Sequence, residues 1–384
     1  MKNIIIIGAR GYHYNYGGWE TFVTNLIDNY QDKKVKFHVP EITNEKSKKK
    51  KIIEKNNVSC LQIYSPNLGF VTMFNYAILA LKYMKKYIEE NKLKNVTIYV
   101  LGCRVGPFYK SLIRPLKKMG TKIYLNPDGL EWTREKWNGL IKQCFKISEY
   151  CMVKQSDKII CDAKAIQNYI DNRYKKFHKE THFIPYGAYL NQKGLQNEIV
   201  NKLFKKYKLK VNNYYLIVGR FVPENNYELM IKEFMKSKTK KDLVIISNIE
   251  ENKFYKELKE KTKFDTDKRI KFVGAIYDKE ALIYIRENAY AYLHGHSAGG
   301  TNPSLLEALA TTKVNILFNA VYNVEVGMMA CLYFSNKEKD LKNIIERADQ
   351  FDEKTRQKYG ELAKDRIKKE YTWKLIVEKY KKIL

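Results

Sequence analysis

The chain has 384 residues, 45% of them hydrophobic and 13% aromatic, and a formal net charge of +29. This length predicts two domains, and this much apolar material excludes an intrinsically disordered protein. The charge favours an anionic partner such as nucleic acid, lipid headgroups or a phosphorylated substrate, although a coding bias that spreads lysine over every solvated face would give the same total.

The first half of the chain alternates short apolar runs with longer amphipathic ones, as in parallel strands joined by crossover helices. The expected strands are residues 3–7, 35–39, 58–63, 97–101, 122–125, 158–161 and 182–184. Helical patterns cover residues 19–30, 71–90 and 136–154. Pro185 and Gly187 then interrupt both periods ahead of a polar stretch, so we place a domain boundary there.

The second half repeats this alternation. Strands are expected in YYLIVGR, DLVIIS, RIKFVG, AYAYLHG and VNILF, and helices at residues 227–237, 252–261, 279–288 and 303–310. The terminal stretch EYTWKLIVEKYKKIL has the apolar spacing of an amphipathic helix. The fold class is therefore α/β, with two Rossmann-like doubly wound domains that face a central cleft.

Ligands of parallel sheets bind beyond the carboxyl ends of the strands, so the loops that follow strands are the candidate sites. The opening loop, GARGYHYNYGGWETF, combines four glycines with a helix start that favours anions. Its glycines fit neither GxGxxG nor a Walker loop, so a connection without a ligand stays an alternative. The loop NPDGLEWTREKW offers indole faces and carboxylates, which suit a sugar; the alternative is a helix start capped by Asp128.

Two loops of the second half suit a nucleotide. In VGRFVPENN, Arg220 ends a strand, where its planar guanidinium can clamp a diphosphate; an ordinary surface arginine is the alternative. In HGHSAGGTNPSLLEALA, the amides of residues 299–301 can hold phosphate oxygens, and Glu307 can accept ribose hydroxyls.

Two patterns that resemble metal sites are weaker. His294 and His296 are spaced like metal ligands but lack a nearby third ligand. Asp265 and Asp267 form a DxD sequence in a charged stretch before a strand, the wrong end of the sheet for a site. We expect no metal and a solvated turn at the DxD sequence.

Taken in order, the motifs GGWET, VGRFVPEN, GGTNPSLLEALA and YTWKLIVEKY make the chain resemble retaining GT-B glycosyltransferases of the family 4 type. More narrowly, GARGYHYNYGGWETF, DGLEWTREKW and HGHSAGGTNPSLLEA resemble the rhamnosyltransferases of bacterial capsule and cell-wall polysaccharide synthesis. The resemblance implies metal-independent transfer of L-rhamnose from dTDP-L-rhamnose to a lipid-pyrophosphate-linked sugar. It also implies an acceptor-binding domain of residues 1–188 plus about 370–384, on which the C-terminal helix docks, and a donor-binding domain of residues 189–369.

The resemblance also implies roles for single residues. Asp128 and Arg220 would be catalytic. The donor would contact Gly18, Arg220, Asn225, His296, Gly299, Gly300, Thr301, Asn302 and Glu307. The acceptor would contact Arg10, Tyr16, Gly17, Glu20, Glu131 and Trp132.

Two positions depart from the wider family. Gly299 stands where that family has a glutamate, and Asn225 stands where it has a lysine. Both departures fit a deoxysugar donor better than a glucose donor, and a UDP-hexose donor is the alternative within the same architecture. A basic nucleic-acid-binding protein is the alternative of another class, but no RNP aromatic pair, zinc finger or basic zipper is present in the sequence.

The cellular location is expected to be cytoplasmic. The six cysteines show no CxxC spacing and lie mostly among apolar residues, as buried thiols do in a reducing compartment. The first residues have the pattern of a strand and not of a charged leader, so no signal peptide is expected. The stretch YKSLIRPLKKMG and residues 70–87 supply basic and apolar residues suited to a membrane surface, so we expect peripheral attachment; for residues 70–87 a core helix is the alternative.

Overall fold

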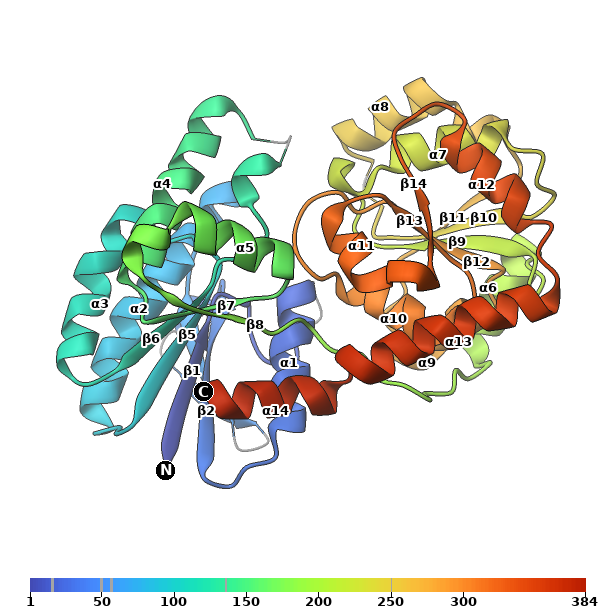
Figure 1. Cartoon of the computed structure of the whole chain (residues 1–384). Coiled ribbons are helices and arrows are strands. Elements are labelled where there is room, and N and C mark those ends of the chain that lie inside the picture. The colour runs from blue at the N-terminus through green and yellow to red at the C-terminus, as the bar shows by residue number, and fades with distance from the viewer. Residues whose placement is uncertain (15–16, 49–50, 56–57, 135–136, 250) are drawn as a thin grey trace. The chain divides into compact units, whose positions relative to one another are not determined.

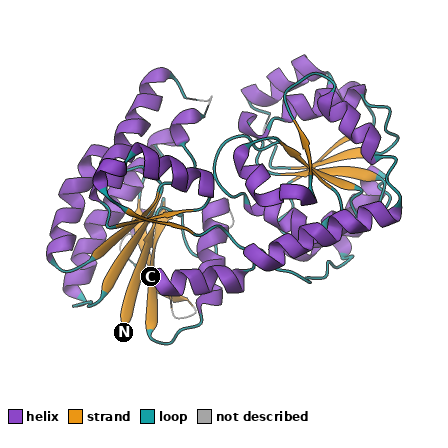
Figure 2. Cartoon of the chain, in the orientation of Figure 1, coloured by secondary structure: helices purple, strands orange, loops and turns teal. Residues whose placement is uncertain are grey.

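The computed structural model describes residues 1–14, 17–48, 51–55, 58–134, 137–249 and 251–384. The chain divides into two compact units: unit 1 comprises Met1–Tyr186 with Trp373–Leu384, and unit 2 comprises Gly187–Thr372. In each unit, helices cover both faces of a largely parallel sheet, as Figure 2 shows. The prediction of two Rossmann-like α/β domains is confirmed.

The sheet of unit 1 has the strand order β3-β4-β2-β1-β5-β6-β7-β8. Its strands are β1 Lys2–Ile7, β2 Val35–Thr43, β3 Ile52–Lys55, β4 Val58–Tyr64, β5 Val96–Leu101, β6 Lys122–Asn126, β7 Lys158–Cys161 and β8 Glu180–Phe183. All pairings are parallel except that of the edge strand β3 with β4. Strand β3 was not expected from the sequence, because its side chains are half-exposed or exposed and include charged residues.

Six α-helices surround this sheet in the described part of unit 1. They are α1 Gly18–Tyr30, α2 Thr72–Glu90, α3 Tyr109–Lys118, α4 Gly139–Gln155, α5 Lys164–Arg173 and α14 Trp373–Ile383. Short 3-10 turns lie at η1 Lys46–Lys48, η2 Gly69–Val71, η3 Gly106–Phe108, η4 Glu131–Thr133 and η5 Lys175–Phe177. Helix α2 buries Tyr76, Ala80 and Met84, so this helix belongs to the core.

Helix α4 begins later than predicted. Asn138 caps it, since the side chain of Asn138 accepts a hydrogen bond from the backbone N–H of Ile141. Asp128 instead lies in the turn after β6, with a φ of 64°. The alternative that made Asp128 the helix cap is therefore wrong.

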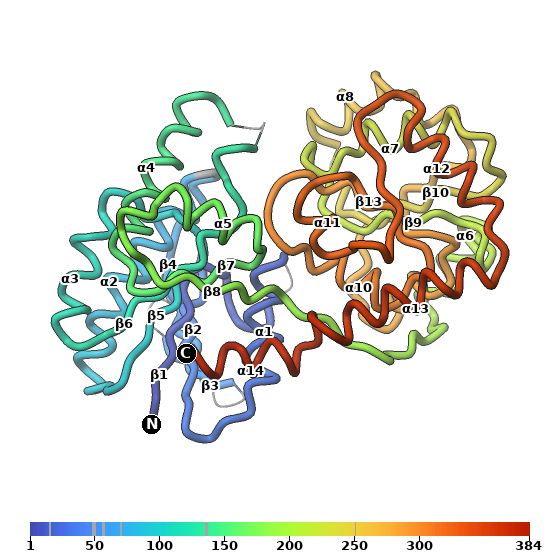
Figure 3. Tube along the Cα trace, viewed as in Figure 1, coloured from blue at the N-terminus to red at the C-terminus, as the bar shows by residue number. Residues whose placement is uncertain are grey.

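The C-terminal helix α14 packs on unit 1, where it lies beside α1 (Figure 1). The hydroxyl of Tyr380 is 3.1 Å from that of Tyr99 on β5, and the ring of Tyr380 is 5.7 Å from the ring of Phe22 on α1. Both ends of the chain consequently lie in unit 1, as the trace in Figure 3 shows. The predicted docking of the terminal helix on the N-terminal domain is confirmed.

The sheet of unit 2 is parallel, with the strand order β11-β10-β9-β12-β13-β14. Its strands are β9 Tyr214–Val218, β10 Asp242–Ile246, β11 Ile270–Gly274, β12 Ala291–His294, β13 Asn315–Phe318 and β14 Leu332–Phe334. Its helices are α6 Glu198–Tyr207, α7 Tyr227–Lys236, α8 Lys253–Thr262, α9 Lys279–Glu287, α10 Pro303–Thr311, α11 Val321–Gly327, α12 Asp340–Ala348 and α13 Glu353–Glu370, with 3-10 turns at η6 Pro223–Asn225, η7 Phe264–Thr266 and η8 Met328–Ala330.

The central strands of unit 2, such as β9, are buried on both faces, as a doubly wound sheet requires, whereas the edge strand β11 is half-buried. Tyr215 and Ile217 of β9 belong to one apolar cluster, whereas Tyr214 and Leu216 belong to another. The continuous apolar runs that marked these strands in the sequence follow from this two-sided burial. The loops at the carboxyl ends of the strands are left to carry the polar groups.

Candidate active site

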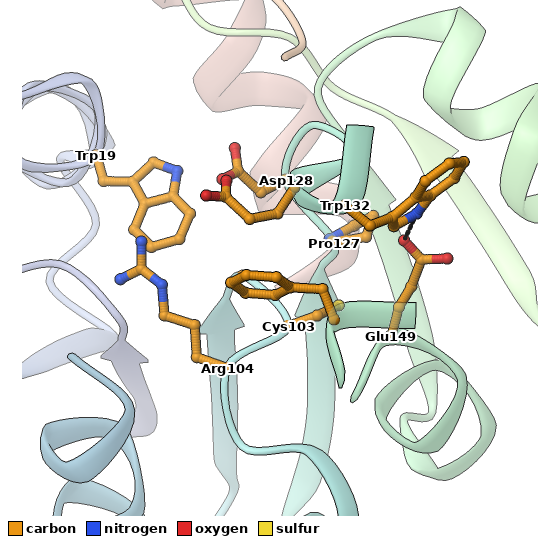
Figure 4. A pocket seen from close by; sticks show the side chains of 10 residues that line it. Trp19, Cys103, Arg104, Pro127, Asp128, Trp132 and Glu149 are labelled. Atoms are coloured by element: carbon orange, nitrogen blue, oxygen red, sulfur yellow. Dashed lines mark hydrogen bonds between the residues drawn. The ribbon is translucent and has the colours of Figure 1, made fainter. Parts of the chain in front are cut away.

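A small cavity of unit 1 lies at the carboxyl ends of β5 and β6, where the sequence predicted a site (Figure 4). Two segments follow those strands, and α1, α4 and the turn η4 complete the wall. The lining residues are Trp19, Gly102, Cys103, Arg104, Pro127, Asp128, Glu131, Trp132, Phe145 and Glu149. Three predicted site residues, Asp128, Glu131 and Trp132, are therefore brought together with residues from distant segments.

One wall of this cavity is a stacked pair. The guanidinium carbon of Arg104 lies 4.3 Å from the ring centroid of Trp19, which is a cation–π contact. Gly102 has a φ of +81°, and a Cβ at this position would lie 2.4 Å from Cη2 of Trp19, so only glycine admits the indole here. Nη1 of Arg104 is buried and has no hydrogen-bond partner in the part of the chain that the structure describes.

Asp128 faces the pair across the cavity in Figure 4. Its backbone N–H donates to Oδ1 of Asn126 at 2.8 Å, which stabilises the turn after β6. Burial raises the pKa of Asp128 above its usual value, although Arg134 and Arg104 act in the opposite direction. A raised pKa is the change that brings a carboxylate toward general-base chemistry near neutral pH.

The opposite wall is held by Glu149 of α4, which is buried. Glu149 accepts hydrogen bonds from the hydroxyls of Tyr169 at 2.7 Å and Tyr174 at 2.5 Å, and from the indole N–H of Trp132 at 3.3 Å. The ammonium of Lys146 lies 4.7 Å from the ring centroid of Trp132. Trp132 is thus held at its edge by a carboxylate and covered on one face by a cation.

Glu131 is held in a similar way. It forms an ion pair with Nε of Arg134 at 2.8 Å and accepts from the indole N–H of Trp137 at 3.1 Å. The carboxylates of Glu131 and Glu149 therefore already have partners within unit 1, and a ligand would share them.

The opening loop leads to this cavity through Trp19. Gly17 precedes α1 and Gly18 is its first residue. Glu20 is buried, and its Oε1 accepts from the backbone N–H of Arg10 at 2.8 Å, so Glu20 stabilises the loop. Arg10, Gly17, Gly18 and Glu20 lie outside the cavity lining. The contact of Gly18 with the donor and the contacts of Arg10, Gly17 and Glu20 with the acceptor stay predictions. The predicted contact of Tyr16 lies outside the described residues.

In unit 2, two predicted loops are joined to each other. Arg220, two residues beyond β9, is exposed. The amide of Asn225 donates to the backbone carbonyl of Arg220 at 2.7 Å, and its Oδ1 is 2.8 Å from Nδ1 of His296. Ser297 donates through both its N–H and its hydroxyl to the carbonyl of Glu224, each at 2.9 Å. The amide that stands in place of the family lysine is therefore used to connect the loops after β9 and β12.

The backbone conformation at Gly299 disfavours any side chain at this position. Its φ of +129° is a conformation that side chains rarely adopt, and a Cβ there would lie 3.0 Å from Nε2 of His296. A side chain at position 299 would therefore adopt a strained backbone conformation and require the imidazole of His296 or the loop to shift by a few tenths of an ångström.

The same loop ends in a capped helix. Oδ1 of Asn302 accepts from the backbone N–H of Ser304 at 2.9 Å, so Asn302 is the N-cap of α10. Gly300 and Thr301 are buried directly before the cap. Glu307, one turn into α10, has a side chain that is 44% exposed, and its Oε2 lies 2.7 Å from Nη2 of the buried Arg286. The start of α10 can therefore bind an anion, and the carboxylate of Glu307 can accept a hydrogen bond from a ligand hydroxyl.

In the two patterns that resemble metal sites, the carboxylates of the DxD sequence form ion pairs and His294 is buried. Asp265 lies 3.0 Å from Nζ of Lys259, and Asp267 lies 2.6 Å from Nη2 of Arg269. Burial lowers the pKa of His294 to about 3, which keeps its imidazole neutral. Among the described residues, no group of three or more His, Cys, Asp or Glu side chains is placed to hold a metal ion.

Four residues of these sites were missed in the sequence: Trp19, Arg104, Glu149 and Arg286. Arg104 was open to prediction, because it follows the expected strand of residues 97–101 as closely as Asp128 follows the next. Trp19 stood inside the motif GGWET without a role. Glu149 and Arg286 lie within helices, and the sequence carries no signal that distinguishes them from other helical charges.

Comparisons with known proteins agree with the fold. Residues 1–189 match the family "Domain of unknown function (DUF1972)", and residues 200–366 match the family "Glycosyl transferases group 1". An uncharacterized glycosyltransferase of Methanocaldococcus jannaschii is 24% identical over 402 aligned positions, which cover 100% of this chain and 98% of that protein.

Solved structures of similar fold cover the full length. Sucrose-phosphate synthase of Thermosynechococcus elongatus superposes with a TM-score of 0.78 at 14% identity, covering 100% of this chain and 98% of that one. Anabaena HepE in complex with UDP gives a TM-score of 0.72 at 14% identity, covering 100% and 99%. An E. coli structure described as trehalose-6-phosphate bound with UDP-2-fluoro glucose gives 0.72 at 10% identity, covering 99% and 98%.

The family match and the fold lead to one conclusion about identity. A group 1 domain covers most of unit 2, and it carries the loop and helix start that the sequence marked as a nucleotide site. The two parallel α/β units match the architecture of GT-B enzymes over their whole length. The chain is a glycosyltransferase with a GT-B fold, and its residues 200–366 match the glycosyltransferase group 1 family.

Proposed function

We propose that the chain transfers L-rhamnose from dTDP-L-rhamnose to a lipid-pyrophosphate-linked sugar, in the synthesis of a capsular or cell-wall polysaccharide. Unit 2 binds the nucleotide sugar and unit 1 binds the acceptor. The observation that carries the donor assignment is the loop of residues 299–301 before the capped helix α10, with Glu307 one turn further on, inside the group 1 domain.

The mechanism follows from the charge that the reaction develops. Breaking the anomeric C–O bond leaves negative charge on the diphosphate, so stabilising that leaving group is the main catalytic requirement. Arg220 and the amides of residues 299–301 supply this stabilisation without a metal ion. The sugar is transferred with retention by front-face attack, and Asp128, whose pKa is raised by burial, faces the acceptor or the transferred sugar.

The donor sugar is inferred from what position 299 lacks. A glucose-type donor presents more hydroxyl groups than a 6-deoxysugar, and a carboxylate is the usual partner for them. Because position 299 is a glycine and offers no carboxylate, the donor pocket suits a sugar with fewer hydroxyls to satisfy. The competing donor is a UDP-hexose, which the neighbours with UDP and UDP-2-fluoro glucose favour.

The acceptor assignment rests on the chemistry of the unit 1 cavity. Indole faces beside carboxylates suit a sugar ring, which stacks on one and donates hydroxyls to the other. Nη1 of Arg104 adds a buried donor without a described partner. These groups recognise the sugar portion of the acceptor.

We also propose peripheral attachment to the inner face of the cell membrane through unit 1. No helix within the described residues is long and apolar enough to cross a membrane. Unit 1 exposes Leu68, Val71, Phe108 and Leu140 near the starts of α2, α3 and α4, and α3 carries basic residues that attract anionic lipids. Binding to vesicles containing phosphatidylglycerol should weaken as salt rises, and indifference to such vesicles at low ionic strength would exclude this attachment.

One experiment tests the function. The protein is incubated with a panel of nucleotide sugars and lipid-pyrophosphate-linked saccharides, with chelator present, and products are identified by mass and linkage. Rhamnose transfer from dTDP-rhamnose is expected at full rate in chelator. Transfer only from a UDP-hexose would replace the donor assignment, and activity that appears only with manganese would overturn the metal-independent mechanism.

A further inference from the structure

Arg286 of α9 is a buried cation that forms an ion pair with Glu307, the proposed ribose-binding carboxylate. The residue is 3% exposed, whereas the side chain of Glu307 is 44% exposed. Nη2 of Arg286 lies 2.7 Å from Oε2 of Glu307. One end of this ion pair is therefore inside unit 2, and the other end reaches its surface at the carboxylate.

The guanidinium is itself connected to the strand that precedes Arg220. Nη2 of Arg286 donates to the hydroxyl of Ser304 at 3.3 Å, and that hydroxyl donates to the carbonyl of Val218 at 3.0 Å. The hydroxyl of Tyr292 also donates to the Val218 carbonyl at 3.0 Å. Helices α9 and α10 and strands β9 and β12 thus meet at one hydrogen-bonded cluster, and Glu307 extends from it.

Arg286 depends strongly on Glu307. Its Nε is buried without a hydrogen-bond partner among the residues that the structure describes, and the carboxylate of Glu307 forms an ion pair with its Nη2. A buried charge that loses its counter-ion is strongly unfavourable, so the pair stays together when the protein is folded. The side chain of Glu307, which has three rotatable bonds, is consequently held in one orientation before any ligand binds.

We propose that Arg286 is a positioning residue for nucleotide binding: it holds Oε2 of Glu307, so that Oε1 is presented to a ribose hydroxyl of the donor. This inference rests on the proposed function of unit 2. Arg286 does not touch the nucleotide; it removes the loss of side-chain freedom that an unrestrained glutamate would undergo on binding. The effect is specific to ligands that carry ribose hydroxyls.

The chain offers a matched control in the same unit. Arg356 of α13 is also buried, its Nη1 lies 2.9 Å from a glutamate, Glu353, and its Nε likewise has no hydrogen-bond partner among the described residues. It stacks on the ring of Tyr290 and takes no part in the loops described above. Arg286→Met and Arg356→Met therefore remove the same kind of buried ion pair from two places.

The test measures the affinity of dTDP and of 2′,3′-dideoxythymidine diphosphate, which lacks the free 3′-hydroxyl of dTDP, by calorimetry, with melting temperatures recorded for every variant. Wild type should prefer dTDP. Arg286→Met should lose about tenfold in dTDP affinity, the equivalent of one hydrogen bond, and most of its preference over the dideoxy analogue, whereas Arg356→Met should keep both. In a Glu307→Gln background, Arg286→Met should have little further effect on dTDP affinity, because the two residues act as one unit.

Each contrary result has a distinct meaning. Equal losses for both nucleotides in Arg286→Met, or an unchanged preference for dTDP, would show that Arg286 is only structural. If Arg286→Met does not fold, the same comparison is made with Arg286→Gln against Arg356→Gln, and an unchanged preference again overturns the proposal. If the wild-type chain binds neither UDP nor dTDP, the proposed function of unit 2 itself fails.

Discussion

The candidate sites of the two units are built in different ways. In unit 1 the cavity consists of side chains that hold one another, and Glu149 alone accepts hydrogen bonds from three neighbours. In unit 2 the backbone of two loops forms the site, and Arg220 and Glu307 end in exposed charges. A substitution in unit 1 is therefore expected to change packing and site together, whereas one in unit 2 can remove a ligand contact alone.

The largest effect is expected at Arg220. Arg220→Ala should reduce the transfer rate by about 10²–10³, the usual loss when one group that stabilises developing negative charge is removed. The melting temperature should stay within the error of wild type, since the side chain is exposed. Steady-state kinetics with saturating acceptor measure the rate, and calorimetry measures the stability.

Arg347→Ala is the control for this variant. Arg347 is an exposed arginine in the last turn of α12, also in unit 2. It should change neither rate nor stability. A wild-type transfer rate in Arg220→Ala would remove this residue from the mechanism, and a large drop in melting temperature would contradict the separation of site and packing in unit 2.

Acid should destabilise both units through buried histidines. Burial lowers the pKa of His38 in unit 1 to about 4, from 6.5 in the unfolded chain. Between these values the unfolded state binds more protons, so stability is complete above about pH 6.5 and falls as pH decreases toward 4. The loss from His38 should approach about 3 kcal/mol at pH 4.

The variant that checks this is His38→Gln, followed by urea denaturation from pH 4 to 7. His38 is hydrogen-bonded to Oδ1 of Asn3 at 3.0 Å and lies 3.3 Å from the hydroxyl of Tyr87, so glutamine keeps a polar group in place. The pH dependence of unit 1 should flatten. An unchanged acid profile would show that other groups cause the loss.

Glu149→Gln should lower both stability and transfer. The amide keeps the shape of the carboxylate but is a weaker acceptor for two tyrosine hydroxyls and an indole N–H. The free energy of unfolding should therefore fall by about 2 kcal/mol. The KM for acceptor should rise because Trp132 is less firmly held. Glu89→Gln, which removes an exposed pair with Lys85, serves as the control and should have no effect.

The contrast between the units also explains how far the sequence could predict them. Strands such as β9 were predictable because burial on both faces produces continuous apolar runs. The loop of unit 2 was predictable because its glycines, its capping residue Asn302 and Glu307 are close together in the chain. Local backbone geometry depends on local sequence, so a site made of loops leaves a readable motif.

The cavity of unit 1 was only partly predictable for the opposite reason. Asp128 and Trp132 come from one segment, but Arg104 and Glu149 come from others that only tertiary packing brings together. The half-exposed edge strand β3 was not predicted, because its sequence is as polar as that of a loop. Glu20 was assigned to the acceptor from the sequence, and its hydrogen bond from the backbone N–H of Arg10 shows that it stabilises the opening loop.

The smallest effect tests whether backbone shape matters in unit 2 as much as charge does. Gly299→Ala adds one carbon to a residue whose φ is +129° and brings that carbon to 3.0 Å from Nε2 of His296. Relieving this contact displaces the imidazole or the loop, at a cost of about 1–3 kcal/mol, so the KM for the donor should rise about tenfold with little change in the KM for the acceptor. Gly139→Ala, where an added Cβ would meet no atom within 4 Å, should leave both KM values unchanged. Equal rises in both KM values for Gly299→Ala would show that the loop does not act on the donor alone, and the distinction between a site made of side chains and a site made of backbone would then fail.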